Sequence, residues 1–299
     1  MSLAERLGYA PDERVLILNA DDVGSSHASN LATFECVENG SLTSASLLVP
    51  APWFPEAAAY ARAHPDVDFG VHLTLTCEYT GYRWRALADR ATSPGLYDDE
   101  GYLWHTMNEA VEHVSVEEAE RELRAQIDTA LAAGVDVTHI DTHMGTVVMP
   151  KFIGTYISLA LEYGIPLFAA YRPSQERLRQ AGLGHFWDGL EPQLRRLDEA
   201  GFPVLDHILT NTTDQPPESK EAYVRDLFAN VRPGLGHFLL HPTTVSEEVA
   251  AVTENVESRV KDYELFRDRS MANLLAELGI HTTTYRQIRE AYRTGALKN

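Results

Sequence analysis

Short apolar, β-branched runs alternate along the chain with longer segments of helical period. The runs that fit β-strands span residues 15–20, 44–49, 67–73, 135–140, 166–169, 204–209, 237–240 and 281–284. Strand runs separated by helical segments are typical of parallel sheets whose connections are helices. The pattern therefore predicts an α/β fold, an irregular parallel β/α barrel of seven or eight strands.

Two of the intervening helices are marked by their ends. Ser115 and Glu118 have capping-box spacing, and an apolar stripe then continues up to Gly134. A second apolar stripe predicts one helix over residues 263–278 that stops at Gly279. Both apolar faces should lie on the sheet.

Residues 78–113 interrupt the alternation of predicted strands and helices with a segment rich in Tyr, Trp, Gly and Asp. A segment of this length in a compact domain is usually an elaborated loop over a site. Its aromatic side chains either stack on sugar rings or pack the insertion onto the barrel. No internal repeat or domain boundary is visible, so we expect one domain over residues 1–299 with an insertion at about 78–113.

Composition excludes several classes of function. The chain has 25 Lys plus Arg against 44 Asp plus Glu, a formal net charge of −19. This acidic balance argues against nucleic acid and anionic membranes as partners. No apolar run reaches the roughly 20 residues that span a bilayer. The only two cysteines, Cys36 and Cys77, read as packing thiols. We expect a cytoplasmic protein, since residues 1–14 also lack an apolar signal core.

Two adjacent carboxylates, Asp21 and Asp22, end the first apolar run and precede Gly24. Barrel enzymes keep their active sites at the carboxyl ends of their strands. Two neighbouring carboxylates repel unless a cation or a shared proton lies between them. The structural alternative is a turn or helix cap, with Asp22 or Ser25 accepting from the first amides of a helix around residues 30–36.

Imidazoles lie near the ends of two further strand runs. His72 lies in one run, where a lone histidine is more often a hydrogen-bonded core residue than a ligand. In the other run, strand alternation sends His139, Asp141 and His143 toward one side. These three side chains make a poor apolar core, so they either bind a metal or form a buried proton network.

Parallel strand ends face the same mouth of a barrel, so residues distant in sequence can meet there. Asp22, His72 and His143 together offer one carboxylate oxygen and two imidazole nitrogens, a set that leaves positions open for water and substrate. Asp21 and Asp141 are then free to act as a base and an orienting group. Zinc, magnesium, manganese, cobalt and iron all suit this donor set.

A fourth histidine, His241, ends another strand run and is followed by Pro242. Its unperturbed pKa near 6.5 suits a group that protonates a leaving amine. The structural alternative is a hydrogen bond from this imidazole to backbone at the strand end.

These runs, with Asp21-Asp22, His72, His139-x-Asp141-x-His143 and His241 in this order, resemble the YdjC-like carbohydrate deacetylase family, which includes the diacetylchitooligosaccharide deacetylases. The resemblance implies a fold related to the polysaccharide deacetylases, frequent homodimers, and removal of an acetyl group from an N-acetylated sugar with one divalent metal ion, magnesium or zinc. It also implies the following roles: metal ligands Asp22, His72 and His143, general base Asp21, proton donor His241, and supporting residues His139 and Asp141.

The chain departs from this family after the third motif. Many members continue with further histidines, whereas this sequence reads Met144-Gly145. The candidate substrate-binding residues are Arg172, Met144 and His139, and the pocket for an acetyl methyl group would use Leu75, Met144 or Val147. One alternative function is a metal-dependent hydrolase or isomerase of another small polar substrate, with Arg172 binding a carboxylate or phosphate. Another is a noncatalytic sugar-binding protein.

Overall fold

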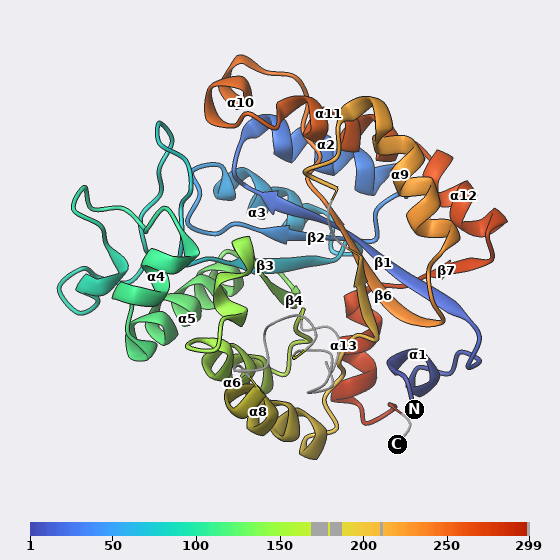
Figure 1. The fold of residues 1–299 in the computed structure, drawn as a ribbon, viewed down its shortest axis with the longest axis horizontal. Coiled ribbons are helices and arrows are strands. Elements are labelled where there is room, and N and C mark those ends of the chain that lie inside the picture. The colour runs from blue at the N-terminus through green and yellow to red at the C-terminus, as the bar shows by residue number, and fades with distance from the viewer. Residues whose placement is uncertain (169–178, 180–186, 210–211, 298–299) are drawn as a thin grey trace.

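The computed structural model describes residues 1–168, 179, 187–209 and 212–297. Within them, one parallel sheet of seven strands has the order β4-β3-β2-β1-β6-β5, and β7 pairs with the first residues of β1. The sheet curls inside a layer of helices (Figure 1), which confirms the predicted barrel-type α/β fold. The strands are β1 (Arg14–Val23), β2 (Ser44–Leu47), β3 (Phe69–Leu73), β4 (Val137–Thr142), β5 (His207–Leu209), β6 (Gly234–Leu240) and β7 (Ile280–Thr282).

Within the described residues, the expected strand at 166–169 is reduced to one bridge. Leu167 pairs with Ile140 of β4, and Ala169 lies outside the described residues. The expected strand at 204–209 is shorter, because only its last three residues pair with β6.

Helices follow most strands and cover the outside of the sheet (Figure 1). They are α1 (Leu3–Arg6), α2 (His27–Glu38), α3 (Phe54–Ala63), α4 (Met107–His113), α5 (Val116–Ala132), α6 (Ile153–Tyr163), α8 (Trp187–Glu199), α9 (Pro217–Ala229), α10 (Glu247–Val252), α11 (Val256–Phe266), α12 (Ser270–Glu277) and α13 (Tyr285–Arg293), with the 3₁₀ turns η1 (Pro94–Leu96) and η2 (His143–Val148). Helix α5 has the predicted capping box, formed by Ser115 and Glu118. Among the described residues, no helix combines the length and apolarity that crossing a membrane requires.

The prediction of one helix over residues 263–278 is wrong. The segment contains the end of α11 and the whole of α12, separated by residues 267–269. Side chains from the end of α2 and the following turn, Asn39 and Ser41, donate hydrogen bonds to the carbonyls of Arg267 and Asp268. Asp268 Oδ1 in turn accepts from the amide of Ser270, the first residue of α12, at 2.8 Å. These bonds provide partners for backbone groups at the break, so the apolar stripe continues over two helices.

The insertion at residues 78–113 forms the lobe on the left of Figure 1. The polar atoms of its aromatic rings bond to the protein itself. Trp84 Nε1 donates to the Thr76 carbonyl at 3.0 Å, and Trp104 Nε1 donates to the Gly95 carbonyl at 2.7 Å. The hydroxyl groups of Tyr82 and Tyr97 likewise donate to backbone carbonyls. These contacts favour the packing alternative for most of the aromatic residues.

Both cysteines are free and buried, as packing thiols should be. Burial raises the pKa of the Cys36 and Cys77 thiols. The two thiols are therefore protonated at neutral pH, and neither has the lowered pKa of a reactive cysteine.

Candidate metal centre

The carboxyl end of β1 brings two adjacent carboxylates into one cavity. Successive side chains of a regular strand face opposite sides, but Asp22 has a φ of 63°. The pairing of β1 with β2 is also irregular between Ala20 and Val23. Aspartate tolerates this left-handed conformation better than most residues. The irregular backbone therefore lets Asp21 and Asp22 line the same cavity.

Asp22, His72 and His143 converge as the sequence predicts. Asp22 Oδ1 lies 3.3 Å from His72 Nε2 and 3.1 Å from His143 Nδ1. The three residues come from the ends of β1 and β3 and from the first residue of η2, directly after β4. One ligand atom from each lies within 4.8 Å of the others. A carboxylate oxygen and two imidazole nitrogens in this arrangement fit a divalent cation.

Asp141 and Glu78 contact the far nitrogens of the two imidazoles. Asp141 Oδ1 lies 2.8 Å from His72 Nδ1, and Glu78 Oε2 lies 2.8 Å from His143 Nε2. Asp141 is buried and does not line the cavity, which agrees with an orienting role. Burial opposes ionisation of Asp141 and Glu78, but contact with the histidines outweighs it and lowers the pKa of each. Sequence reasoning missed Glu78, because this residue lies five positions after the end of β3, at the start of the insertion, where no strand pattern predicts the direction of its side chain.

Arg259 of α11 is the second group that sequence reasoning missed. Its Nη1 donates to Asp22 Oδ2 at 2.9 Å. Burial of Asp22 favours the protonated acid, but Arg259 and the two imidazoles outweigh burial and hold the pKa of this carboxyl well below its usual range. Asp22 is therefore ionised at neutral pH, as a metal ligand must be.

Asp21 has the opposite electrostatic environment. The pKa of Asp21 is raised to about 7, mainly by burial and also by the nearby carboxylates of Asp141 and Asp22, while His72 and a hydrogen bond from Asn19 oppose the rise. Asn19 Nδ2 donates to Asp21 Oδ1 at 2.7 Å and fixes its orientation. A carboxylate whose pKa lies near 7 can take up and release a proton at neutral pH.

His241 faces both carboxylates from the end of β6. Its Nε2 lies 4.0 Å from Asp21 Oδ2 and 4.0 Å from Asp22 Oδ2. Its Nδ1 lies 3.0 Å from Thr213 Oγ1, and its backbone amide donates to Asp262 Oδ2 at 3.1 Å. Burial, together with the positive charge of Arg259, lowers the pKa of His241 to about 3. This imidazole is therefore neutral at neutral pH, unlike the unperturbed group that the sequence suggests.

The remaining expected site residues have different surroundings. His139 is fully buried, stacks on Tyr285 with 4.0 Å between ring centroids, and does not line the cavity. Met144 lines the cavity with 58% of its surface exposed. Arg172 lies outside the described residues. The helix-cap alternative for Asp22 and Ser25 is wrong, because Ser26 caps α2.

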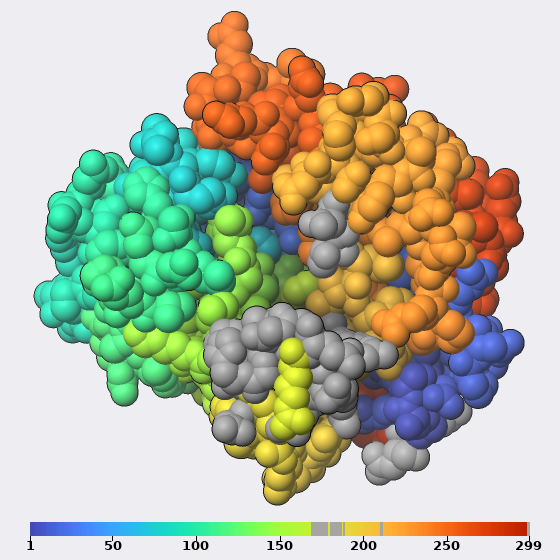
Figure 2. All heavy atoms as spheres, in the orientation of Figure 1, coloured from blue at the N-terminus to red at the C-terminus, as the bar shows by residue number. Residues whose placement is uncertain are grey.

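The cavity has a volume of about 650 Å³. The space-filling view shows a hollow near the centre of the molecule, between the green and the orange segments (Figure 2). The apolar lining of the cavity differs from the expected acetyl-methyl pocket, since Leu75 and Val147 are fully buried and do not line it. Its described lining residues are Asp21, Asp22, His72, Glu78, Tyr79, Thr142, His143, Met144, Gly145, Val148, Phe168, Thr213, Asp214, Leu239, His241, Thr253, Asn255 and Arg259.

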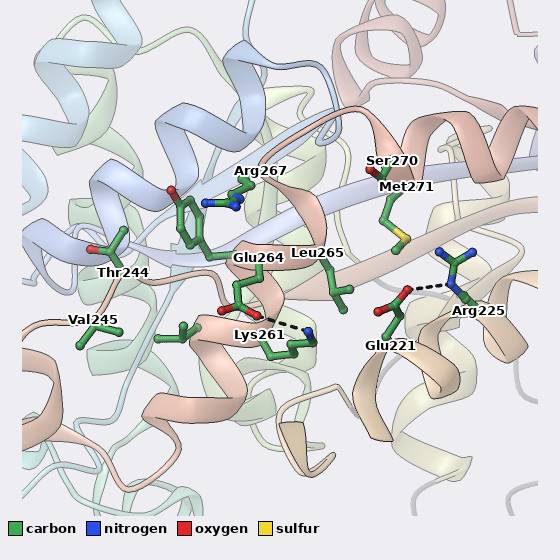
Figure 3. A pocket seen from close by; sticks show the side chains of 12 residues that line it. Glu221, Arg225, Thr244, Val245, Lys261, Glu264, Leu265, Arg267, Ser270 and Met271 are labelled. Carbon is green, nitrogen blue, oxygen red and sulfur yellow. Dashed lines mark hydrogen bonds and ion pairs between the residues drawn. The ribbon is translucent and has the colours of Figure 1, made fainter. Parts of the chain in front are cut away.

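A second depression, of about 510 Å³, lies between α9, α11 and α12 (Figure 3). Four of its charged side chains pair with one another, Arg225 with Glu221 at 3.0 Å and Lys261 with Glu264 at 3.2 Å. It has no histidine or cysteine among its described lining residues. The chemistry-bearing side chains are therefore in the cavity at the strand ends.

Comparison with known proteins gives related sequences over nearly the whole chain. Residues 15–277 match the family model described as YdjC-like protein. A carbohydrate deacetylase of Thermus thermophilus is 32% identical over 302 aligned residues, 97% of this chain and 99% of that protein. A carbohydrate deacetylase of Brevibacillus brevis is 38% identical over 66% of this chain and 80% of that protein. The crystal structure of a proposed cellobiose-phosphate cleavage protein from Enterococcus faecalis superposes with a TM-score of 0.75 at 26% identity, covering 92% of this chain and 99% of that one.

Proposed function

Because this chain belongs to the YdjC-like protein family, we propose that it is a metal-dependent carbohydrate deacetylase that hydrolyses the acetamido group of an N-acetylated sugar. The observation that carries the proposal is the convergence of Asp22, His72 and His143 beside Asp21 at an open cavity. The names of its relatives support the substrate class and the amide bond that is broken.

In this proposal Asp22, His72 and His143 hold one divalent cation, magnesium or zinc. When bound, such a cation supplies Lewis-acid polarisation of a carbonyl group and lowers the pKa of a water molecule. Asp141 and Arg259 support the ligands, Asp141 through its bond to His72 and Arg259 through its bond to Asp22.

Asp21 is the general base. It accepts a proton from the water that attacks the acetyl carbonyl, a step that its pKa of about 7 favours near neutral pH. The attack makes a bond between the water oxygen and the carbonyl carbon and breaks the carbonyl π bond, whose electron pair moves onto the carbonyl oxygen. Cleavage of the C–N bond then requires a proton on the departing nitrogen.

His241 carries that proton. Because its pKa is lowered to about 3, His241 does not store a proton in the resting enzyme. Its Nε2 lies 4.0 Å from Asp21 Oδ2, which is longer than a hydrogen bond, so the proposed transfer of the proton from Asp21 to His241 and on to the amine requires a closer approach of the two side chains or a bridging water. We assign the hydrogen of the neutral ring to Nδ1, where Thr213 Oγ1 accepts it and leaves Nε2 free for the relay.

The apolar lining supports a deacetylase over an enzyme for anionic substrates. Val148, Phe168 and Leu239 line the cavity and are suited to an acetyl methyl group. Among the described lining residues, Arg259 is the only Lys or Arg, and it is engaged by Asp22. The open cavity beside the three donors also favours an enzyme over a noncatalytic sugar-binding protein. The cytoplasmic location and the homodimer stay predictions.

The test measures acetate release from N-acetylglucosamine and its short oligomers by wild type, His72→Gln and His143→Gln, together with bound metal. We expect zinc- or magnesium-dependent acetate release by wild type, and loss of both metal and acetate release in each variant. Undiminished acetate release without bound metal would refute the ligand roles. The substrate proposal fails if wild type with metal releases no acetate from any N-acetyl sugar.

A further inference from the structure

Each imidazole of the candidate metal centre has a carboxylate oxygen at both of its ring nitrogens, but the two nitrogens exchange partners between the rings. His72 presents Nε2 to Asp22 Oδ1, at 3.3 Å, and Nδ1 to Asp141, at 2.8 Å. His143 presents Nδ1 to the same oxygen, at 3.1 Å, and Nε2 to Glu78, at 2.8 Å. Each ring therefore lies between the common carboxylate and a carboxylate of its own.

We propose that Glu78 is a positioning residue for His143, equivalent to Asp141 for His72. A carboxylate that accepts the far N–H of a ligand histidine fixes the tautomer and orientation of the ring and raises its basicity. Glu78 would thus make Nδ1 of His143 the nitrogen that a cation meets, while Asp141 selects Nε2 of His72. This inference rests on the metal site of the proposed function.

The Glu78–His143 pair is more buried than a typical surface ion pair, and the structure around it restrains the Glu78 side chain. That side chain is 23% exposed and lines the cavity. The backbone beside it is fixed because the Cys77 amide donates to the Trp104 carbonyl at 2.8 Å. The ring of Trp84, also from the insertion, lies edge-on to His143 with 5.9 Å between centroids. The insertion therefore contacts this imidazole through both Glu78 and Trp84.

The geometry favours a positioning role over direct ligation by Glu78. Its Oε2 meets the nitrogen of His143 that is opposite to the nitrogen facing Asp22. In the described part of the chain, the groups of three side chains that could hold an ion are Asp22 with His72 and His143, and Asp21 with His72 and Asp141. Glu78 belongs to neither group.

The test titrates the metal-stripped full chain with Zn²⁺ by calorimetry. We expect Glu78→Ala to weaken Zn²⁺ binding about 10- to 100-fold, and Glu78→Gln to weaken it less, because an amide oxygen can still accept from Nε2. The matched control is Asp214→Asn, which removes a negative charge from the same cavity without a contact to His143. We expect this control to change the affinity less than about threefold.

A second readout identifies the nitrogen that carries the proton. Long-range proton–nitrogen spectra of the zinc-loaded chain should show His143 protonated on Nε2 and His72 protonated on Nδ1. In Glu78→Ala the Nε2 proton of His143 should exchange faster with water, while the Nδ1 proton of His72 stays protected. Thermal unfolding of each metal-free variant checks that it is folded.

Three results would overturn the positioning role: Glu78→Ala binding Zn²⁺ as tightly as wild type, Asp214→Asn weakening binding as much as Glu78→Ala, or a proton on Nδ1 of zinc-loaded His143. None of these readouts uses a sugar. A wild-type protein that binds Zn²⁺ but releases no acetate would therefore refute the substrate proposal alone. A wild type that binds neither Zn²⁺ nor Mg²⁺ would overturn both proposals.

Discussion

The imidazole of His139 lies directly over Gly70 of the neighbouring strand. A β-carbon on Gly70 would be 2.4 Å from Cε1 of that ring. The ring cannot yield easily, because its other face stacks on Tyr285 with 4.0 Å between centroids. This close approach gives a physical reason for glycine two residues before His72.

We expect Gly70→Ala to lower the free energy of unfolding by about 1–3 kcal/mol, the usual cost of an overpacked core. The displaced strand should also weaken metal binding through His72. Urea unfolding and zinc titration measure the two effects. Gly81→Ala is the matched control, since nothing lies within 4 Å of its β-carbon position, and should change stability by less than about 0.5 kcal/mol. Equal stabilities of the two variants would contradict this account.

Thr213 should affect catalysis through His241. Thr213→Val keeps the shape of the side chain but removes the oxygen 3.0 Å from Nδ1. Loss of one hydrogen bond of about 1 kcal/mol corresponds to a roughly fivefold fall in kcat. KM should change little, because this bond does not hold the substrate.

Thr213→Ser separates orientation of the ring from packing. It retains the hydroxyl and loses only a methyl group, so kcat should return toward the wild-type value. Steady-state acetate release at saturating N-acetyl sugar measures both variants. A Val variant with wild-type kcat would exclude a role for Thr213 in the proton relay.

Metal removal should lower stability because the three ligands come from segments far apart in the sequence that only the folded chain brings together. At a free zinc concentration of about 100 times Kd, the folded state should gain about 2.7 kcal/mol. Thermal unfolding with zinc and with a chelator measures the gain. His143→Gln should show no such difference, and an equal shift in that variant would place the bound zinc elsewhere.

Acid should destabilise the protein through its buried neutral histidines. Burial lowers the pKa of His139 to about 4 and that of His237 to about 3. Below pH 6.5 the unfolded chain takes up protons that these folded residues do not. Stability from each is therefore complete above pH 6.5 and falls by about 1.4 kcal/mol per pH unit as pH decreases toward the folded pKa.

His237→Gln tests the sign of this effect. Between pH 7 and pH 5 the variant should lose about 2 kcal/mol less stability than wild type, because one proton-binding site of the unfolded chain is gone. Urea unfolding at the two pH values gives the difference. An identical loss in both proteins would mean that His237 does not contribute.

The polar residues at the strand ends could be predicted because their pattern is local. Asp22, His72 and His143 each end an apolar run, and parallel strands place such ends at one edge. The distribution of the apolar stripe over α11 and α12 could not be predicted, since the break between them depends on Asn39 and Ser41 from a distant segment.

Glu78, Arg259 and Thr213 lacked a sequence signal for the same reason. They come from the insertion, from a helix and from the segment before α9, where no periodic run points toward the cavity. Their importance follows only from contacts with Asp22, His143 and His241. The pKa of His241 could not be predicted from its own sequence motif either. It depends on burial of the ring and on the charge of Arg259, and both follow from the tertiary structure.

The side chain that bonds His143 Nε2 stands at the first position of the insertion. Protein engineers who exchange this lobe between relatives would therefore alter the surroundings of a metal-binding imidazole without touching any strand. A chimaera joined after Tyr79 keeps the native carboxylate, whereas one joined at Leu75 takes whatever residue the donor supplies. At this junction the lobe contributes directly to the surroundings of a residue at the barrel mouth. The choice of splice point therefore decides whether a transplanted loop changes substrate specificity alone or metal binding as well.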